Sequence, residues 1–392
     1  MRRLLALSST LFSAVLLLTG VTVPADAHRL IRVPGAEYQE LAPLDDLTTA
    51  GTVASGHTNP ADYAGLTQAG LPSPSGVPGI QIDGYFPDNS HLNTNHGWNH
   101  DSQFVIRLPR RWNGGLVVSG SPGVRAQYAN DKAISDYVLS LGYAYAGTDK
   151  GNTGAEFYTD GLRPGDAIVE WNVRTTQLTR AARATIAQYY GRPPREVVAA
   201  GISNGGYLVR WQLENHPELY TRGVDLEGTL WTVNGPNLFT FLPPAIRGYE
   251  QHSPELITGA GFDPRSDFLW DYHYAIYWKL TQRIYAAELD PTYTGTEADY
   301  DYAHRPEAHK AVKRIALTGK IGKPLLTIHG TYDSLLPITQ DSDVYAEMAR
   351  STGLHMYQRV EAGNHVDGLV DTYPDRLTPL VPLLREAIRT PS

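Results

Sequence analysis

A serine with a glycine two positions away on each side is the first group in the sequence that suits covalent chemistry. Gly201-Ile-Ser203-Asn-Gly205 follows the apolar run 197–200 and precedes a helical pattern over 207–215. In a sharp strand-to-helix turn a serine is exposed as a nucleophile, and the glycines avoid collision with the strand and the helix. A glycine-rich turn can also hold an ordinary serine, but the preceding buried strand favours a nucleophile.

A serine nucleophile needs a base, and the base needs an acid to orient it. Asp333 follows an apolar strand over 325–329, and His365 follows the next strand over 356–360. Neighbouring strands that end at the same edge of a sheet would place both side chains beside Ser203, so we predict a catalytic triad of these three residues. The competing acids lie in the next helix or too near His365 in sequence to reach its Nδ1; they are Asp341, Asp343 and Asp367.

The elements that must position these groups alternate between short apolar strands and amphipathic helices. This order predicts an α/β protein with a mostly parallel sheet. The expected strands are 104–108, 115–119, 143–148, 196–202, 223–230, 325–329 and 356–360. The expected helices, besides 207–215, are 165–190, 339–351 and 376–389.

Two of these segments resemble the α/β-hydrolase superfamily. Ile328-His-Gly-Thr-Tyr-Asp333 is similar to its acid turn, and Gly363-Asn-His365 to its histidine loop. The resemblance implies helices on both faces of the sheet and the chain order serine, acid, histidine. Ser119-Gly-Ser-Pro-Gly123 resembles the family's His-Gly-x-Pro-Gly loop, which assigns one oxyanion donor to the N–H of Ser121. The residue after the nucleophile, Asn204, supplies the other.

A weaker resemblance covers about twenty residues. Tyr145-Ala-Gly-Thr-Asp149-Lys-Gly-Asn152 and Ser203-Asn-Gly-Gly206 are similar to segments of secreted 3-hydroxybutyrate-oligomer hydrolases and, more distantly, of the tannase and feruloyl-esterase group. Asp149 and Lys150 are expected at the carboxyl end of a strand, where sites are built. They are therefore candidate substrate contacts, although a surface ion pair is an equal alternative.

The regular alternation breaks between residues 232 and 315, which are rich in tyrosine and tryptophan. We predict that this segment is a lid inserted between two parts of the hydrolase core, residues 101–231 and 316–392. Residues 28–100 are interpreted as an N-terminal extension packed on the core. Trp270, Tyr274 and Trp278 are candidate substrate contacts. The alternative is that these rings only pack the insertion onto the core.

The N-terminus predicts export. A basic start, an apolar run over 4–18 and Ala25-Asp26-Ala27 form a signal peptide over residues 1–27, so we expect a secreted, extracellular protein without a membrane segment after cleavage. The net charge of −8, without a basic stripe, argues against a nucleic-acid partner. The chain contains no cysteine. The histidines at 91, 96 and 100 fit no zinc spacing, so we expect neither metal nor cofactor.

The sequence therefore favours a serine hydrolase acting on small or oligomeric carboxylic esters, such as hydroxyalkanoate oligomers or aromatic esters. A secreted serine exopeptidase of the same fold is the alternative, with possible amine anchors at Asp263, Asp267, Asp271 and Glu288. A binding protein that has lost catalysis is a third reading, which the intact set of three residues disfavours. The oligomeric state is left open.

Overall fold

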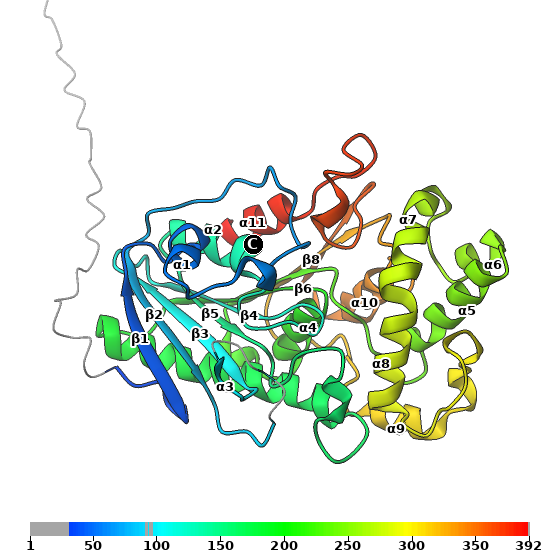
Figure 1. Ribbon diagram of the computed structural model, residues 1–392, viewed down its shortest axis with the longest axis horizontal. Coiled ribbons are helices and arrows are strands. Elements are labelled where there is room, and N and C mark those ends of the chain that lie inside the picture. Colours follow the sequence, from blue (N-terminus) through cyan, green and yellow to red (C-terminus); the bar gives the residue numbers. More distant parts are fainter. Residues whose placement is uncertain (1–30, 91–92, 94–96, 391–392) are drawn as a thin grey trace, which may run out of the picture.

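The computed structural model describes residues 31–90, 93 and 97–390. The predicted signal peptide and the histidines at positions 91 and 96 lie outside these residues. Within them, nine strands form one sheet in the order β1-β2-β3-β5-β4-β6-β7-β8-β9 (Figure 1). Their bounds are β1 Tyr38–Leu44, β2 Gly79–Tyr85, β3 Gln103–Pro109, β4 Gly115–Gly120, β5 Ala144–Thr148, β6 Glu196–Ile202, β7 Arg222–Leu226, β8 Leu325–Gly330 and β9 His355–Val360.

The six strands from β5 to β9 in the sheet order are parallel, and β1, β2 and β3 continue the sheet antiparallel. Because the central strands are covered on both faces, their side chains alternate between two apolar cores. In β6, Val197 and Ala199 pack into one core and Val198 and Ala200 into the other. The carboxyl ends of β6, β7 and β8 consequently meet at one edge of the sheet.

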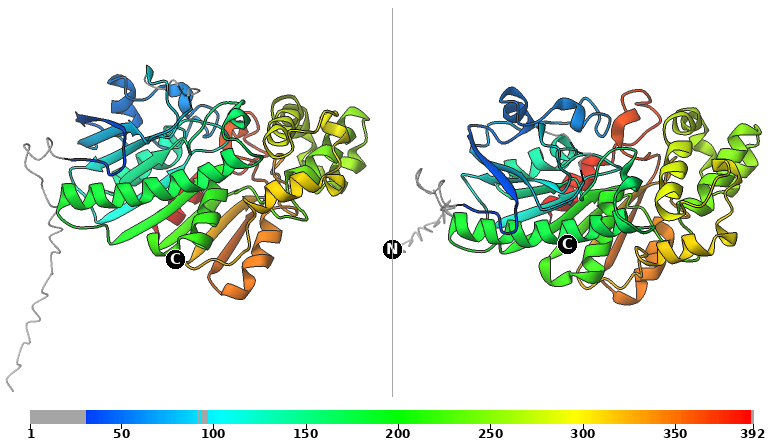
Figure 2. Two further views of the ribbon diagram at one scale, coloured as in Figure 1. Left: turned by 90° about the horizontal axis from the view of Figure 1, so that it is seen from below. Right: turned by 60° about the horizontal axis from the view of Figure 1, so that its bottom comes forward.

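Helices cover both faces of the sheet (Figures 1 and 2). On one face lie α3 (Asp166–Tyr190), α4 (Asn204–Asn215) and α10 (Ser342–Ala349), whose apolar residues share one core. On the other lie α2 (Asp136–Ser140) and α11 (Val381–Arg389). Together with the parallel sheet, this is the predicted α/β architecture. A short helix, α1 (Thr49–Ala54), precedes β2.

The predicted strands from 104 onward correspond to β3–β9, but the interpretation of 28–100 as an extension missed β1 and β2. The inward-facing residues of β2 include polar ones that a hydrophobic pattern does not reveal. Gln81 and Asp83 are buried beside Arg107, whose Nε donates to the Gln81 amide oxygen at 2.8 Å. The predicted strand 223–230 was too long, because the chain turns at Glu227, where φ is 52°.

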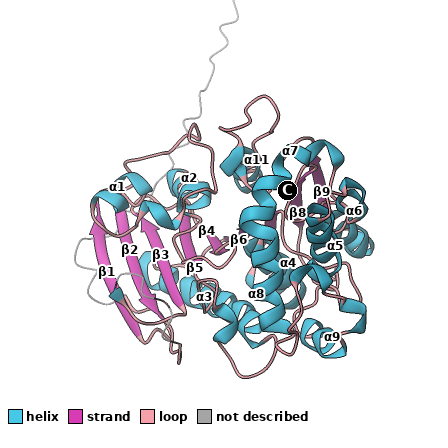
Figure 3. Ribbon diagram, turned by 45° about the vertical axis from the view of Figure 1, so that its right-hand side comes forward, coloured by secondary structure: helices cyan, strands magenta, loops and turns pink. Residues whose placement is uncertain are grey.

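The inserted segment, residues 232–315, is helical and lies at the opposite end of the molecule from β1 (Figures 1 and 2). It comprises α5 Leu238–Glu250, α6 Pro254–Gly259, α7 Asp267–His273, α8 Lys279–Leu289 and α9 Pro306–Lys313. A π-helical turn, Tyr274–Trp278, joins α7 to α8 without a break, so that the two form one rod (Figures 1 and 3). Among the described residues, no helix combines the length and the apolar character needed to span a membrane.

We predict that Arg210→Ala lowers the free energy of unfolding by about 3–5 kcal/mol, because it leaves buried carboxylates without their counter-charge. The Arg210 guanidinium lies between Asp225 (2.6 Å) and Asp341 (2.8 Å), and all three side chains are buried. Urea unfolding followed by circular dichroism measures the change. Arg283→Ala is the matched control: its side chain is 63% exposed, and its ion pair with Glu297 is expected to contribute at most about 1 kcal/mol. Equal losses in both variants would contradict the prediction.

Candidate active site

Ser203 lies in the turn between β6 and α4, in a backbone conformation that few residues adopt. Its φ is 56° and its ψ −121°. The close approach of strand and helix requires the flanking glycines: a Cβ on Gly201 would lie 2.2 Å from the carbonyl oxygen of Gly205, and one on Gly205 would lie 2.5 Å from that of Gly120. The turn thus holds the Ser203 hydroxyl above the sheet edge, at the start of α4.

The structure brings the three predicted triad residues into contact. His365 Nε2 lies 3.1 Å from Ser203 Oγ, and His365 Nδ1 lies 2.8 Å from Asp333 Oδ2. Asp333 is fixed at its other oxygen, Oδ1, which accepts hydrogen bonds from the N–H groups of Leu335 and Leu336 at 2.8 Å each. Burial alone would raise the pKa of Asp333, but His365 and a hydrogen bond from His329 hold it below its ordinary value.

The competing acids are committed elsewhere. Asp341 accepts hydrogen bonds from Arg210 and from the N–H of Leu230. Asp343 pairs with Arg359 at 2.7 Å. Asp367 accepts the N–H groups at the start of α11. Of the four carboxylates considered from sequence, only Asp333 contacts the imidazole.

A second carboxylate beside His365, that of Glu227, was not predicted. Glu227 is fully buried, and its Oε2 lies 3.6 Å from His365 Nδ1. Oε1 accepts the N–H of Gly330 and Oε2 that of Val366, both at 3.1 Å, so the side chain links the acid loop to the histidine loop. Burial and the charge of Asp333 raise its pKa well above the ordinary value. The sequence signal that could have revealed Glu227 was the presence of a charged residue inside the predicted buried strand 223–230.

The prediction that the Ser121 N–H is an oxyanion donor is wrong. Its N–H continues the β4–β5 ladder by donating to the Thr148 carbonyl at 3.0 Å, so it is already bonded. Its hydroxyl is also engaged, since it donates to the Arg125 carbonyl and accepts from Lys150 Nζ, both at 2.6 Å. Asn204 does lie at the site: it is the first residue of α4, where an N–H has no acceptor within the helix.

Asp149 and Lys150 lie beneath the site and do not line its pocket, so the substrate contacts expected for them are wrong. Both are fully buried. Asp149 accepts N–H groups from Asn93 (2.8 Å), Gln103 (2.9 Å) and Gly151 (2.8 Å). Burial raises the pKa of Asp149 to about 6 and lowers that of Lys150 to about 7. Because Lys150 donates to Ser121, this pair supports the loop that follows β4.

A pocket of about 190 Å³ opens over Ser203 and His365. The inserted segment forms much of its wall, which includes Leu238, Tyr277, Leu280, Thr281, Ile284 and Tyr285. The core contributes Leu66, Pro122, Gly123, Val124, Arg125, Asn204, Thr229, Leu335, Leu336 and Val366. The insertion therefore covers the site with a mainly apolar surface.

The three aromatic side chains expected to touch substrate do not line this pocket. Trp270 Nε1 donates to Ser266, and Tyr274 lies on the outside of the insertion, where its hydroxyl donates to Glu250. Trp278 is buried, and its Nε1 donates to the Ser334 carbonyl at 2.6 Å. These rings pack the insertion together and onto the core, as the alternative reading held.

Two side chains join the insertion to the site itself. Asn204 Nδ2 donates to the Tyr285 hydroxyl at 2.6 Å and to the Gly123 carbonyl at 3.0 Å. Through Asn204, the nucleophile turn is thus bonded both to α8 and to the loop after β4. Trp278 makes the corresponding bond to the acid loop.

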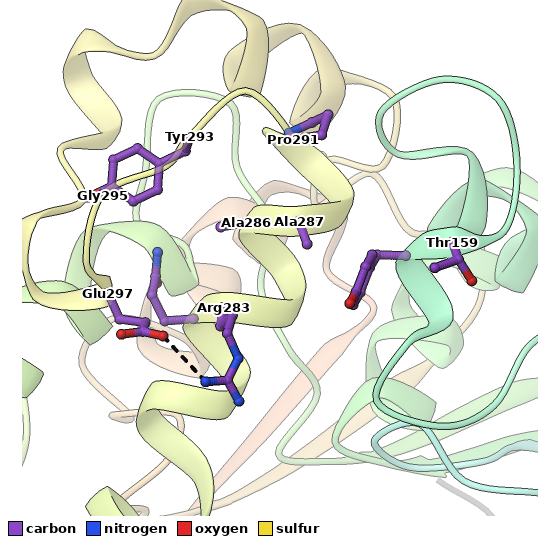
Figure 4. Close-up of a pocket in the computed structure, with 10 residues that line it drawn as sticks. Thr159, Arg283, Ala286, Ala287, Pro291, Tyr293, Gly295 and Glu297 are labelled. Carbon is purple, nitrogen blue, oxygen red and sulfur yellow. Dashed lines mark ion pairs between the residues drawn. The ribbon is translucent and has the colours of Figure 1, made fainter.

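A larger hollow, of about 430 Å³, lies on another side of α8 (Figure 4). It is lined by Thr159 and by Arg283, Tyr293 and Glu297, with Arg283 paired to Glu297 at 3.6 Å. None of the triad residues lines this hollow.

The proposed amine anchors do not line the triad pocket either. Asp263 pairs with Arg265, Asp271 accepts the Tyr249 hydroxyl, and Glu288 accepts the N–H of Ala167. Asp267 lies 3.9 Å from Arg376. Each carboxylate already has a partner away from Ser203.

Two groups of potential metal ligands occur in the described part of the chain. One is the buried set Glu227, His329 and Asp333, already hydrogen-bonded as described. The other, Asp88, Asp160 and Glu170, offers the carboxylate oxygens that calcium and magnesium prefer. Here Arg174 supplies positive charge at 2.7 Å from Glu170 and 3.9 Å from Asp88. His100, the described histidine of the loop considered above, stacks on Tyr85.

Comparison with known proteins identifies the fold. None of the family models matches the chain, and no curated protein matches it by sequence. Among solved structures it is similar to feruloyl esterase B from Aspergillus oryzae (TM-score 0.61, 13% identity, 87% of this chain and 82% of that one). It is also similar to an esterase from Aspergillus oryzae (TM-score 0.53, 13% identity, 86% and 81%). The chain has the α/β-hydrolase fold that these esterases share.

Glu227→Gln tests the state of the second carboxylate. The pKa of a glutamate in the unfolded chain is near 4.3, and the pKa of Glu227 in the native state lies well above that value. At pH values between these two pKa values the native state therefore binds more protons than the unfolded state. Its contribution to stability is therefore complete below about pH 4.3 and is lost as the pH rises. The glutamine does not titrate.

The free energy of unfolding of Glu227→Gln should thus gain on that of the wild type as the pH rises above about 4.3, by up to about 1.4 kcal/mol per pH unit. Urea unfolding at several pH values measures the difference, in which the titrating groups that do not interact with Glu227 cancel. Glu218→Gln, at a side chain that is 61% exposed, is the control and should follow the wild type. Parallel curves for wild type and Glu227→Gln would refute the raised pKa.

Proposed function

We propose that this protein is a serine hydrolase that cleaves carboxylic esters through an acyl-serine intermediate. The observation that carries the proposal is the continuous chain of contacts from Asp333 through His365 to Ser203, at 2.8 and 3.1 Å, beneath a mainly apolar pocket. The fold shared with two esterases agrees with it. Its triad is the one expected from the sequence.

In the proposed reaction, Ser203 Oγ attacks the ester carbonyl carbon while His365 Nε2 takes the hydroxyl proton. Asp333 accepts the Nδ1–H of His365, which fixes the tautomer and stabilises the imidazolium that forms. His365 then returns the proton to the departing alkoxide, and the acyl group remains on Ser203. Water activated by His365 releases the acid in the second half of the reaction.

The tetrahedral intermediate needs two N–H donors for its oxyanion. The N–H of Asn204 is one, as expected from the sequence. For the other we assign Gly123 in place of Ser121. Gly123 lines the triad pocket beside Asn204, and Pro122 before it has no N–H to offer.

The insertion acts in this proposal as a lid that sets the range of substrates. Its pocket-lining residues belong to α5, to the π-helical turn and to α8. Aromatic esters and hydroxyalkanoate oligomers both fit a wall that combines aliphatic side chains with tyrosines. An exopeptidase that grips a free amine is disfavoured, because the carboxylates suited to that role are paired elsewhere. The signal sequence over residues 1–27 supports action outside the cell.

Ser203→Ala is expected to lower kcat/KM for p-nitrophenyl esters by at least about 10,000-fold and to abolish labelling by a fluorophosphonate probe, because the attacking oxygen is lost. Circular dichroism should remain that of the wild type. Ser334→Ala, at another buried serine near the triad, should still be labelled. Probe labelling of Ser203→Ala at the wild-type rate would place the nucleophile elsewhere.

Leu280→Ala is expected to change the relative kcat/KM among p-nitrophenyl esters of different acyl length by roughly tenfold, because it removes part of the pocket wall. Ile276→Ala removes a side chain that is 48% exposed in the neighbouring turn and does not line the pocket, so the relative values should stay unchanged. If Leu280→Ala only lowered all rates in proportion to the melting temperature, the insertion would be packing and not a selectivity element.

A further inference from the structure

One guanidinium lies in the wall of the triad pocket, and no acidic residue does so among the described residues that line it. The guanidinium is that of Arg125, and the other titratable side chains in the lining are His365 and the phenols of Tyr277 and Tyr285. The rest of the wall is mainly apolar, together with the backbone of the loop after β4. The described wall of the pocket thus contains a positive charge and no carboxylate to balance it.

Arg125 is partly buried, and it differs in its partners from three arginines whose side chains are buried. Arg107 is held at 2.7 Å by Asp131, and Arg210 by Asp225 and Asp341. Arg385 has no carboxylate but donates to three backbone carbonyls. Arg125 donates through Nη1 to the carbonyl of Asp62 at 3.2 Å, and in the described part of the chain no carboxylate lies within 4 Å of it. Most of its five N–H donors are therefore left for another acceptor.

The pKa values of these arginines reflect the same difference in partners. For Arg107, burial would lower the pKa, but Asp131 raises it above the ordinary value. For Arg125, burial lowers the pKa, and the weaker influence of Tyr277, Asp62 and Tyr272 opposes it. An arginine still keeps its proton in a protein, so the pocket wall holds a partly buried cation with no ion pair to the described carboxylates.

The backbone of Arg125 is held in place relative to the nucleophile. Ser121 Oγ donates to the Arg125 carbonyl at 2.6 Å and is itself held by Lys150. Asn204, next to Ser203, donates to the carbonyl of Gly123 in the same loop at 3.0 Å. The buried pair Asp149 and Lys150, the oxyanion loop and the arginine thus form one connected unit. An anion bound by Arg125 would therefore keep a set distance from the reacting carbonyl.

We propose that Arg125 binds a carboxylate of the substrate, so that the preferred substrates are esters whose pocket-bound part carries a second, ionised carboxylate. A guanidinium binds a carboxylate through two parallel N–H···O bonds, which suits a planar group presented between apolar walls. The volume of about 190 Å³ limits this part to a short chain. The inference rests on the proposed ester hydrolysis and specifies its substrate.

The test compares two esters of one acyl chain, whose far carboxyl group is ionised in one and masked as a methyl ester in the other. One is p-nitrophenyl hydrogen adipate, and the other is its methyl diester, p-nitrophenyl methyl adipate. The purified full chain should show the higher kcat/KM for the carboxylate. Arg125→Gln should lower the ratio of the two kcat/KM values by about 10- to 100-fold, the range expected for a charge-assisted hydrogen bond. Arg125→Lys, which keeps the charge but not the paired donors, should give an intermediate ratio.

Arg283→Gln is the matched control, because it removes the same net charge from an exposed position outside the triad pocket. It should leave the ratio unchanged. An equal fall of the ratio in Arg283→Gln would show long-range attraction and overturn the inference. The inference would also be overturned if Arg125→Gln and Arg125→Lys both left the ratio unaltered while still cleaving the neutral diester. The melting temperature of each variant separates misfolding from lost recognition.

Failure of the inference is distinguishable from failure of the proposed function. If the enzyme cleaved neither ester and took no fluorophosphonate label at Ser203, ester hydrolysis itself would be refuted. A peptide substrate tests whether the carboxylate that Arg125 binds belongs to an ester or to a peptide. The assignment to esters would be overturned if the enzyme cleaved an N-acylated dipeptide with a free carboxyl terminus faster than the adipate ester, and if Arg125→Gln lost that peptide cleavage.

Discussion

The close contact between the start of α4 and the ends of the central strands is the constraint on which the site depends. Ser203 is held at a positive φ, and the glycines on either side of it leave no room for a Cβ. Such a conformation persists only where the surrounding structure enforces it. Here β6 fixes the turn on one side, α4 on the other, and the N–H of Ser203 donates to the Leu226 carbonyl of β7 at 2.9 Å.

The buried carboxylate of Glu227 extends that constraint to the other two triad residues. It lies at the end of β7, between the loop that carries Asp333 and the loop that carries His365, and it accepts one N–H from each. Both acidic groups face the same imidazole, but only Asp333 lies at hydrogen-bond distance. Burial and the charge of Asp333 raise the pKa of Glu227, which disfavours a second negative charge behind His365.

The parallel part of the sheet and the three triad positions could be predicted because their signals are local. The apolar strands before Ser203 and Asp333 are buried on both faces, and the glycines at 201 and 205 are required by direct contact. β1 and β2 escaped prediction because a buried polar network around Arg107 replaces part of the apolar alternation. Glu227 escaped because its role arises only when β7 is placed between two distant loops.

The pocket itself could not be read from residue types. Tyrosine and tryptophan serve equally well as packing or as binding surface, and the choice depends on which side of the α7–α8 rod each one lies. Tyr277 faces the pocket, whereas Trp278, the next residue, is buried against the acid loop. Likewise the Ser121 N–H was a reasonable donor until the pairing of β4 with β5 assigned it to Thr148.

Two of the bonds between the insertion and the core lie beside the triad, and they limit how the site can be entered. Asn204 donates to the Tyr285 hydroxyl of α8 beside the nucleophile, and Trp278 of the preceding π-helical turn donates to the Ser334 carbonyl beside the acid, so the rod is bonded to both the nucleophile turn and the acid loop. A flap that swung open on a hinge would break both and disturb the very groups it uncovers. Entry through a fixed mouth, with side chains yielding locally, keeps them in place. For the proposed hydrolase, entry of this kind would need no surface or partner to open the pocket.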